Sequence, residues 1–430
     1  MARWDRKYNP SVLVRELEKS RSINSEGMVQ FGGFGIMTIS PKLEAMICIN
    51  PEITLEDKHE IVQQSIFNVG NSGVLSPEAI LTEINRFEKN YLSSREQNYI
   101  LATSLSVNKD FHKLPNVRID ENRITFSASL PKSFAKAIDN HRSINFHMRE
   151  KLLPFNYLYA RVAVSTKSIY LAVEKALGSL NIFRGILNFV INYGQQTFSF
   201  GVTSRKPINQ ILLGPIHTLH KPNGEVAIQD LFWYEEGYQE TLHPYHNNTT
   251  VNNVKQFDWI IKSVYEIRKN IQKSKIREEL QSAILLYNDA LDSCNYEVSY
   301  IKLWAALELL TATGQDDSHK VTIRRAAFIF NDPIQEKMHL ELLRNFRNNL
   351  VHRGYMNAKL EIFVYDLKLY VEKLLRFLIF NQSRFESFGD VGYLLDRNIE
   401  PDKLDKNSKL VNFAKKINKS RNPNKRFGAS

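Results

Sequence analysis

The chain has 430 residues, of which 43% are hydrophobic and 24% charged, with 57 Lys and Arg against 46 Asp and Glu. This composition excludes a disordered or fibrous protein, and the length indicates two or three domains. No run of eighteen apolar residues occurs, and the two cysteines, Cys48 and Cys294, allow neither a disulfide framework nor a cysteine-based zinc site. Because no apolar segment opens the chain, we expect a cytoplasmic protein without a membrane partner.

The first part of the chain, residues 1–255, mixes two kinds of pattern and is expected to form an α+β domain. Helical spacing of apolar residues predicts helices near 8–20, 56–68, 76–106 and 168–187. Alternation and turn residues predict strands or hairpins over 29–40, 117–130, 157–168 and 188–202. The second of these is expected to turn at Asp120 to Asn122.

The pattern changes near Asp258, where strand alternation stops and long helical patterns begin. Five helices are predicted, over 277–293, 296–312, 318–330, 333–352 and 358–380. The links between them are short, which favours antiparallel neighbours in a helical bundle. We therefore expect an all-α domain over 256–381, followed by a basic tail over 382–430.

The tail carries nine basic residues and two acids between Asp402 and Ser430. Such a segment favours a polyanionic partner such as RNA, through phosphate contacts and counterion release. Four cations are candidate RNA ligands: Lys415, Lys416, Lys419 and Arg421. The alternative is a solvated terminus that only aids solubility.

Arg347 lies in the segment 344–354, RNFRNNLVHRG, among residues that are mostly apolar at helical spacing. The core-facing stripe of this helix is expected to consist of Ile334, Met338, Leu342, Phe346 and Leu350. An unpaired charge in a core costs several kcal/mol, so Arg347 must either pair with an acid or face a pocket.

Glu308, in YIKLWAALELLTA, is a carboxylate in an equally apolar setting, so an ion pair with Arg347 across the bundle is expected. One interpretation is a satisfied interior pair with a purely structural role. The other is that Glu308 holds the guanidinium ready for a phosphate, which the planar fork of arginine suits.

His352 follows Arg347 by five residues, which places the two about 140° apart around an unbroken helix. They could act on one small target if the helix unwinds near His352. They could also do so if a second copy of the chain contributes across a two-fold axis.

The C-terminal third resembles the HEPN superfamily, in particular the Apea-like branch found in bacterial anti-phage defence proteins. The resemblance covers about 275–380 and is carried by LLYNDALDS, YIKLWAALELL, RRAAFIF and RNNLVHRG. The signature of that family is an Arg, a polar residue and, four to six positions on, a His. Arg347, Asn348 and His352 fit it with the shortest spacing.

The resemblance implies a metal-independent endoribonuclease that needs no cofactor and dimerises through its helical domain. His352 would act as general base or acid, Arg347 would stabilise the transition state, Asn348 would position the phosphate, and Glu308 would orient Arg347. Arg344 and Arg353 are further candidates for binding RNA, with tRNA as a candidate substrate.

The expected products are a 2′,3′-cyclic phosphate and a 5′-hydroxyl. In this reading the protein is a toxin-like effector of antiviral defence by abortive infection. The region 1–255 then restrains it or senses a trigger from the phage. Because some HEPN domains lack activity, the alternative is a non-catalytic module for nucleic-acid binding or dimerisation.

Two further hypotheses come from residues outside the bundle. Two His-x2-His pairs, His217 with His220 and His243 with His246, suggest a zinc site, although no nearby acid completes a hydrolytic set. The tail alone could bind nucleic acid without cleavage, but only Phe413 and Phe427 are available there to stack on bases.

Overall fold

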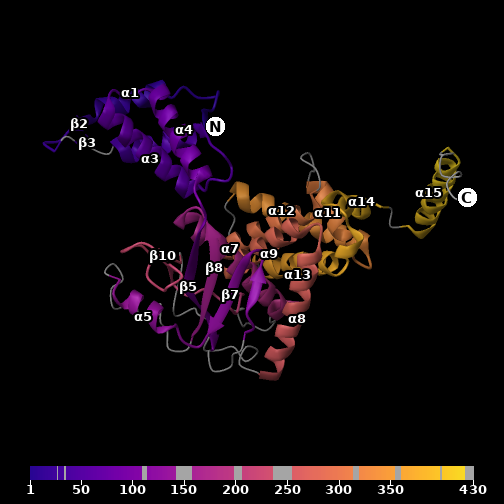
Figure 1. Ribbon diagram of the computed structural model, residues 1–430. Helices are drawn as coiled ribbons and strands as arrows, with labels where there is room; N and C mark the ends of the chain where they lie inside the picture. Colours follow the sequence, from indigo (N-terminus) through magenta and orange to yellow (C-terminus); the bar gives the residue numbers. More distant parts are fainter. Residues whose placement is uncertain are drawn as a thin grey trace, which may run out of the picture. The chain divides into compact units, whose positions relative to one another are not determined.

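The computed structural model (Figure 1) shows two compact units with different secondary structure. It describes residues 1–26, 28–32, 35–108, 114–141, 157–197, 206–235, 254–312, 319–353, 360–397 and 400–421. The first unit comprises Met1–Leu105, His112–Leu180 and Leu213–Tyr238, and the second comprises Ser106–Phe111, Asn181–Leu212 and Gln239–Ser430. The expected order of a mixed α and β region followed by helices is therefore confirmed.

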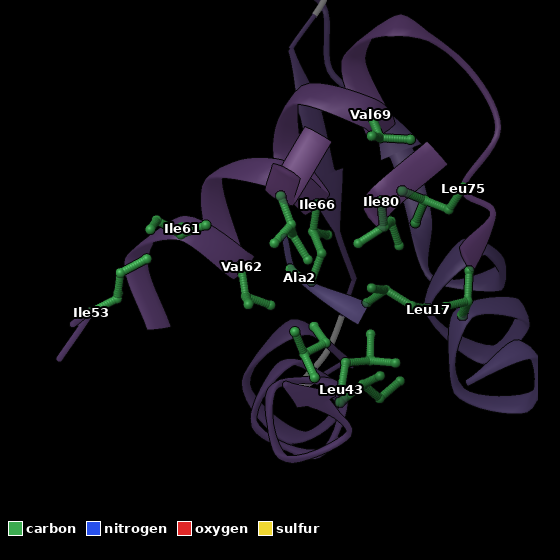
Figure 2. Packing of buried hydrophobic residues seen from close by; sticks show 14 residues of the cluster. Ala2, Leu17, Leu43, Ile53, Ile61, Val62, Ile66, Val69, Leu75 and Ile80 are labelled. Atoms are coloured by element: carbon green, nitrogen blue, oxygen red, sulfur yellow. The ribbon is translucent and has the colours of Figure 1, made fainter. Parts of the chain in front are cut away.

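The first unit begins with four helices: α1 (Ser11–Lys19), α2 (Gly35–Ala45), α3 (Leu55–Ser72) and α4 (Pro77–Ser93). Two short antiparallel pairs accompany them: β1 (Arg3–Trp4) with β4 (Ile47–Cys48), and β2 (Arg21–Ile23) with β3 (Val29–Phe31). Figure 2 shows their shared core, in which Leu17, Leu43, Val62, Ile66 and Ile80 are fully buried. Capping side chains start two of the helices, since Thr54 accepts from the amide of Asp57 and Ser76 from that of Ala79.

A six-stranded sheet follows in the order β10-β9-β5-β8-β7-β6. Its strands are β5 (Gln97–Asn108), β6 (Val117–Ile119), β7 (Asn122–Ser127), β8 (Tyr157–Thr166), β9 (Ile216–His220) and β10 (Trp233–Tyr234). The pairs β6–β7, β7–β8, β5–β9 and β9–β10 are antiparallel. Two helices belong to this region, α5 (Lys132–Asp139) and α7 (Ile169–Asn192). Asn122 on β7 donates to the Ser179 hydroxyl on α7 at 2.8 Å, so this helix lies against one face of the sheet.

Three of the predicted elements in this half are wrong in part. The segment 29–40 is a strand only to Phe31, and α2 begins at Gly35, with Ile39 and Leu43 buried at helical spacing. The helix predicted to 106 ends at Ser93, and Gln97–Asn108 is a strand whose continuous buried run lacks alternation. Residues 188–192, expected in a hairpin, are the end of α7, and 198–202 lie outside the described residues.

The second unit is dominated by helices. They are α8 (Val254–Lys273), α9 (Arg277–Asp292), α10 (Tyr296–Thr311), α11 (His319–Ala327), α12 (Pro333–Arg353), α13 (Leu360–Phe380), the short η4 (Gln382–Arg384), α14 (Phe388–Leu395) and α15 (Pro401–Arg421). The five predicted helices are confirmed. The unit also contains Asn181–Leu212, which lies upstream of the boundary placed at 255.

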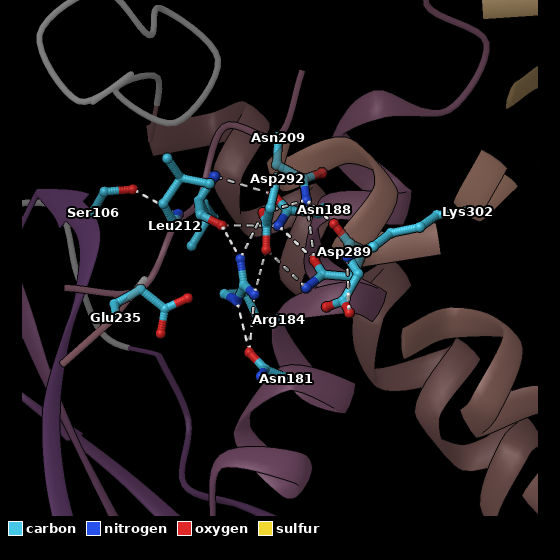
Figure 3. A network of polar contacts seen from close by, with 12 residues as sticks. Ser106, Asn181, Arg184, Asn188, Asn209, Leu212, Glu235, Asp289, Asp292 and Lys302 are labelled. Atoms are coloured by element: carbon cyan, nitrogen blue, oxygen red, sulfur yellow. Dashed lines mark hydrogen bonds and ion pairs between the residues drawn. The ribbon is translucent and has the colours of Figure 1, made fainter. Parts of the chain in front are cut away.

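A buried polar network joins the end of α7, the segment 206–212 and α9 (Figure 3). Arg184 donates both terminal nitrogens to Asp292, at 2.9 and 2.6 Å, and also donates to the carbonyl of Ile211. The Asn188 side chain bonds both the amide and the carbonyl of Ile211, and Asn209 donates to Asp292 at 2.7 Å. These bonds satisfy backbone groups of a segment that has no helix or strand of its own.

A second buried network lies between α7 and α13. Lys368 pairs with Glu372 at 2.7 Å, with both side chains fully buried, and donates to the carbonyl of Asn192. Glu372 accepts from the Tyr287 hydroxyl at 2.5 Å and from the amide of Gly194 at 2.9 Å. Burial lowers the pKa of Lys368 and raises that of Glu372, while their mutual attraction opposes both shifts.

The chain beyond α13 also packs on the helices. Asp396, at the end of α14, accepts from Arg325 at 2.8 and 2.9 Å and from Arg324. These hydrogen bonds hold the pKa of Asp396 at about 2. Residues before α15 are therefore part of the folded unit rather than of a free tail. Among the described residues, no helix has the length and apolar character needed to cross a membrane.

We predict that Asp292→Ala lowers the free energy of unfolding by about 3 kcal/mol, because it leaves the Arg184 charge buried without its acid. The Arg184 side chain is 2% exposed. The matched control is Lys302→Ala, since the Lys302–Asp289 pair is 39% and 50% exposed and should contribute less than about 1 kcal/mol. Urea unfolding followed by circular dichroism measures both, and equal losses would contradict the assigned role of the network.

Candidate active site

Helix α12 positions Arg347 on its core-facing side. Leu340, Leu343 and Leu350 are buried, and Arg347 lies seven, four and three positions from them. The Tyr300 hydroxyl on α10 donates to the carbonyl of Leu343 at 2.7 Å, which holds this side of α12 against the bundle. The Arg347 side chain is half-buried there.

Two arginines on consecutive turns of α12 lack an acid. Arg347 donates only a long bond of 3.4 Å to Asn348, and its Nε atom is buried without a hydrogen-bond partner. Arg344 repeats this arrangement, with 3.4 Å to Asn345 and a buried Nε atom that has no partner. Among the described residues, neither guanidinium has a carboxylate within 4.0 Å. Both therefore have donors available for an anion.

The expected ion pair between Glu308 and Arg347 is not formed in the described part of the chain. Glu308 instead accepts from the indole Nε1 of Trp304 at 2.7 Å. The spacing of four residues between Trp304 and Glu308 was the signal for this local bond, because such residues lie on one face of a helix. Glu308 thus does not orient Arg347.

The prediction that the stripe of residues four apart faces the core is wrong for the first part of α12. Ile334, Met338 and Leu342 are 75%, 64% and 61% exposed. Only the later part of the stripe is covered, since Leu350 is buried and Phe346 packs between Tyr300 and Phe363. The first three turns of α12 therefore present an apolar row outward.

His352 and Arg353 are helical residues of α12, and their side chains lie outside the described residues. Because the helix continues to Arg353, it does not unwind before His352, and the separation of about 140° from Arg347 holds for the backbone. About five helical turns separate Ile334 from His352, so their Cα atoms lie on the same side of α12. The structure thus brings Arg347 and Asn348 together but places His352 on another side.

The candidate RNA ligands of the tail lie on α15. Lys415 and Lys416 are exposed, as are Leu410 and Phe413. Lys419 and Arg421 belong to the same helix, but their side chains, like Phe427, lie outside the described residues. This segment is a helix with basic and apolar residues on its surface.

The alternative hypothesis of a zinc site at the histidine pairs is not supported in the described residues. His217 and His220 are three apart on β9, which directs them to opposite faces of a strand. His217 is hydrogen-bonded with Thr103 at 2.7 Å, and His220 with Thr218 and the carbonyl of Gly224. No group of three His, Cys, Asp or Glu that could hold a metal is found there, and His243 and His246 lie outside these residues.

No protein-family model, curated protein or solved structure matches this chain.

Burial lowers the pKa of His220 to about 4 from 6.5. The neutral ring is therefore the form that the fold stabilises, and this stability is complete above pH 6.5 and is lost as the pH falls toward 4. We predict a loss of up to about 3 kcal/mol over this range, and a flatter profile for His220→Gln. Unfolding followed at a series of pH values tests this, and equal slopes for both proteins would contradict it.

Proposed function

We propose that the second unit is a metal-independent endoribonuclease of the HEPN type. The observation that carries the proposal is the pair of half-buried guanidinium groups on α12, Arg344 and Arg347, which have no carboxylate partner among the described residues. The helical fold of this region is compatible with the proposal, and the Arg-polar-x3-His sequence lies on α12.

The setting of these arginines supports a phosphate ligand. Elsewhere in the same unit the buried guanidinium groups are paired, Arg184 with Asp292 and Arg325 with Asp396. Desolvation without an acceptor is unfavourable, so an incoming phosphate would supply the acceptors that Arg344 and Arg347 lack. A planar fork also suits the phosphorane-like transition state of RNA cleavage.

The proposed chemistry is attack of a ribose 2′-oxygen on the phosphorus of the adjacent phosphodiester. His352 removes the 2′-hydroxyl proton, the 2′-oxygen bonds to phosphorus, and the bond to the 5′-oxygen breaks as that oxygen takes up a proton from solvent. Arg347 stabilises the charge that develops on phosphorus oxygens, and Asn348, 3.4 Å from it, positions the phosphate. The products are a 2′,3′-cyclic phosphate and a 5′-hydroxyl, and Glu308 has no part in the step.

A second copy of the chain completes the site in this proposal. Arg347 and His352 lie on different sides of an unbroken α12, so one copy does not aim both at one phosphate. The exposed row of Ile334, Met338 and Leu342 shares its side of the helix with the His352 backbone and offers an apolar surface for a partner. The proposed enzyme is therefore a homodimer with a composite site.

The biological role follows from the danger of such an activity to its host. We propose a cytoplasmic toxin-like effector of anti-phage defence, with RNA such as tRNA as its substrate and the first unit as its regulator. A fragment starting at residue 256 would lose the Arg184–Asp292 pair and the bond from Lys368 to Asn192. The full chain is therefore the form to test.

The separation of Arg347 from His352 favours a second candidate function. If no partner brings them together, the unpaired arginines of α12 and the exposed lysines of α15 bind nucleic acid without cutting it. This candidate is a non-catalytic module for nucleic-acid binding or dimerisation.

We predict that the full chain cleaves bulk tRNA or total RNA in buffer with EDTA and leaves cyclic-phosphate ends. His352→Ala and Arg347→Ala should each lower the rate by about 100-fold or more, because each removes a group that acts in the transition state. Arg384→Ala, a change at an exposed arginine of η4, is the matched control and should retain activity. If these proteins bind RNA but none of them cleaves it, and phage-infected cells that contain the wild-type protein show no cleavage either, the non-catalytic binding module is established.

We predict that Met338→Asp and Leu342→Asp halve the mass of the particle in solution, because they place charge in the apolar row of the proposed dimer. Light scattering after gel filtration measures the mass. Met37→Asp, at an equally exposed apolar position of the first unit, should leave it unchanged. If the wild-type protein has the mass of a monomer, the proposed composite site between two copies is contradicted.

A further inference from the structure

Strands β6, β7 and β8 have one buried face and one open face. Their register places Val117 beside Ile124 and Ile124 beside Val162, and all three side chains are buried. The opposite face carries the alternate residues, which are exposed or half-buried apart from Tyr159: Arg118, Arg123, Thr125, Ser127, Arg161 and Ala163. An antiparallel sheet with one solvated face commonly carries small polar residues there, but this one carries three arginines.

The arginines are close neighbours on this face. Arg118 and Arg123 are directly opposite each other across β6 and β7. Arg161 on β8 is opposite Thr125 on β7 and is therefore the diagonal neighbour of Arg123, about 7–8 Å away between backbones. Like charges in direct register destabilise a sheet, and the six alternate residues of this face include no acid. Arg123 and Arg161 therefore repel each other across this face.

Arg161 has a second unfavourable feature, which points to a ligand. Its Nε atom and the hydroxyl of Ser127, its diagonal neighbour on β7, are both buried without a hydrogen-bond partner. The Phe134 ring of α5 lies 5.7 Å from the guanidinium and holds it in place. Burial lowers the pKa of Arg161. A phosphate bound on this face would supply an oxyanion acceptor for the Arg161 guanidinium.

We propose that the open face of β6, β7 and β8 binds the phosphate backbone of a nucleic acid through Arg123 and Arg161. Phosphates spaced along a chain match several guanidinium groups spread over a flat face better than a single anion does. Tyr159, the aromatic residue of the set, is buried, so base stacking contributes little and binding depends on charge rather than on sequence. The surface belongs to the first unit and does not rest on the proposed cleavage.

The test uses the full chain and a labelled DNA oligonucleotide, which has no 2′-hydroxyl and is not cut by the proposed chemistry. Fluorescence anisotropy gives the affinity over a salt series for wild type, Arg123→Gln, Arg161→Gln and the control Arg95→Gln, an exposed arginine outside the face. We expect each of the first two to weaken binding about tenfold and to lower the salt slope by about 0.7 to 0.9 per lost phosphate contact. Arg95→Gln should match wild type.

Single-stranded, duplex and RNA forms of the same sequence identify the preferred nucleic acid, and Arg123→Gln should weaken whichever binds best. Affinity and slope equal to wild type in Arg123→Gln and Arg161→Gln would overturn the proposal, as would an equal loss in Arg95→Gln. Competition by polyglutamate as strong as by the oligonucleotide would also overturn it and indicate an acidic protein partner. Loss of RNA cleavage in Arg347→Ala with unchanged binding of DNA would separate this surface from the proposed active site.

Discussion

The ion pair between Arg184 and Asp292 is the contact on which the arrangement of the second unit depends. It joins α7 to α9 through two hydrogen bonds, and Asn188 and Asn209 fasten the segment 206–212 to the same point. Gly185 beside it allows close approach, because a Cβ atom there would lie 2.6 Å from Ile284 of α9. The Arg184 side chain is 2% exposed, so without Asp292 its charge would remain desolvated and unpaired. The C-terminal helices therefore rely on residues from the first half of the chain, which no boundary near residue 255 anticipates.

The same sequence signal, an arginine at helical spacing among apolar residues, had two different outcomes in this protein. Arg184 lies within SLNIFRGIL and finds its acid in Asp292, whereas Arg347 lies within RNFRNNLVH and does not find one in Glu308. Periodicity identifies a charge that needs a partner, but not the partner, because that depends on which helices become neighbours. Glu308 instead accepts a hydrogen bond from Trp304, four positions earlier on the same helix face, and this spacing is visible in the sequence.

Element type was predictable wherever the pattern was long and one-sided, as in α9 and α13. The element type or its buried face was not predictable where two interpretations of the pattern fit equally well. In α12 one apolar row contains Ile334, Met338 and Leu342 and another contains Leu340, Leu343 and Leu350, and the contact of Tyr300 with the Leu343 carbonyl selects the second. Strand β5 is buried over most of its length and has no alternation to distinguish it from a helix. In both cases tertiary packing decides between patterns that the local sequence leaves equivalent.

Among the described residues, Arg344, Arg347 and Arg161 differ from arginines that pair with an acid. Arg86 pairs with Glu83, Arg21 with Glu18 and Arg325 with Asp396, so carboxylates are available and used. The half-buried side chains of Arg344 and Arg347 on α12 and of Arg161 on β8 instead have buried Nε atoms without acceptors, a feature that the Nε atom of Arg268 on α8 shares. Each such group lowers the stability of the free protein, and a carboxylate at one neighbouring position would remove that penalty while also blocking an anion. A phosphate ligand reverses the balance, because its oxygens satisfy the same donors with charge-assisted bonds. Both α12 and the face of β6, β7 and β8 lower the stability of the free protein in this way. A protein that binds phosphate groups at two surfaces would show this feature at both.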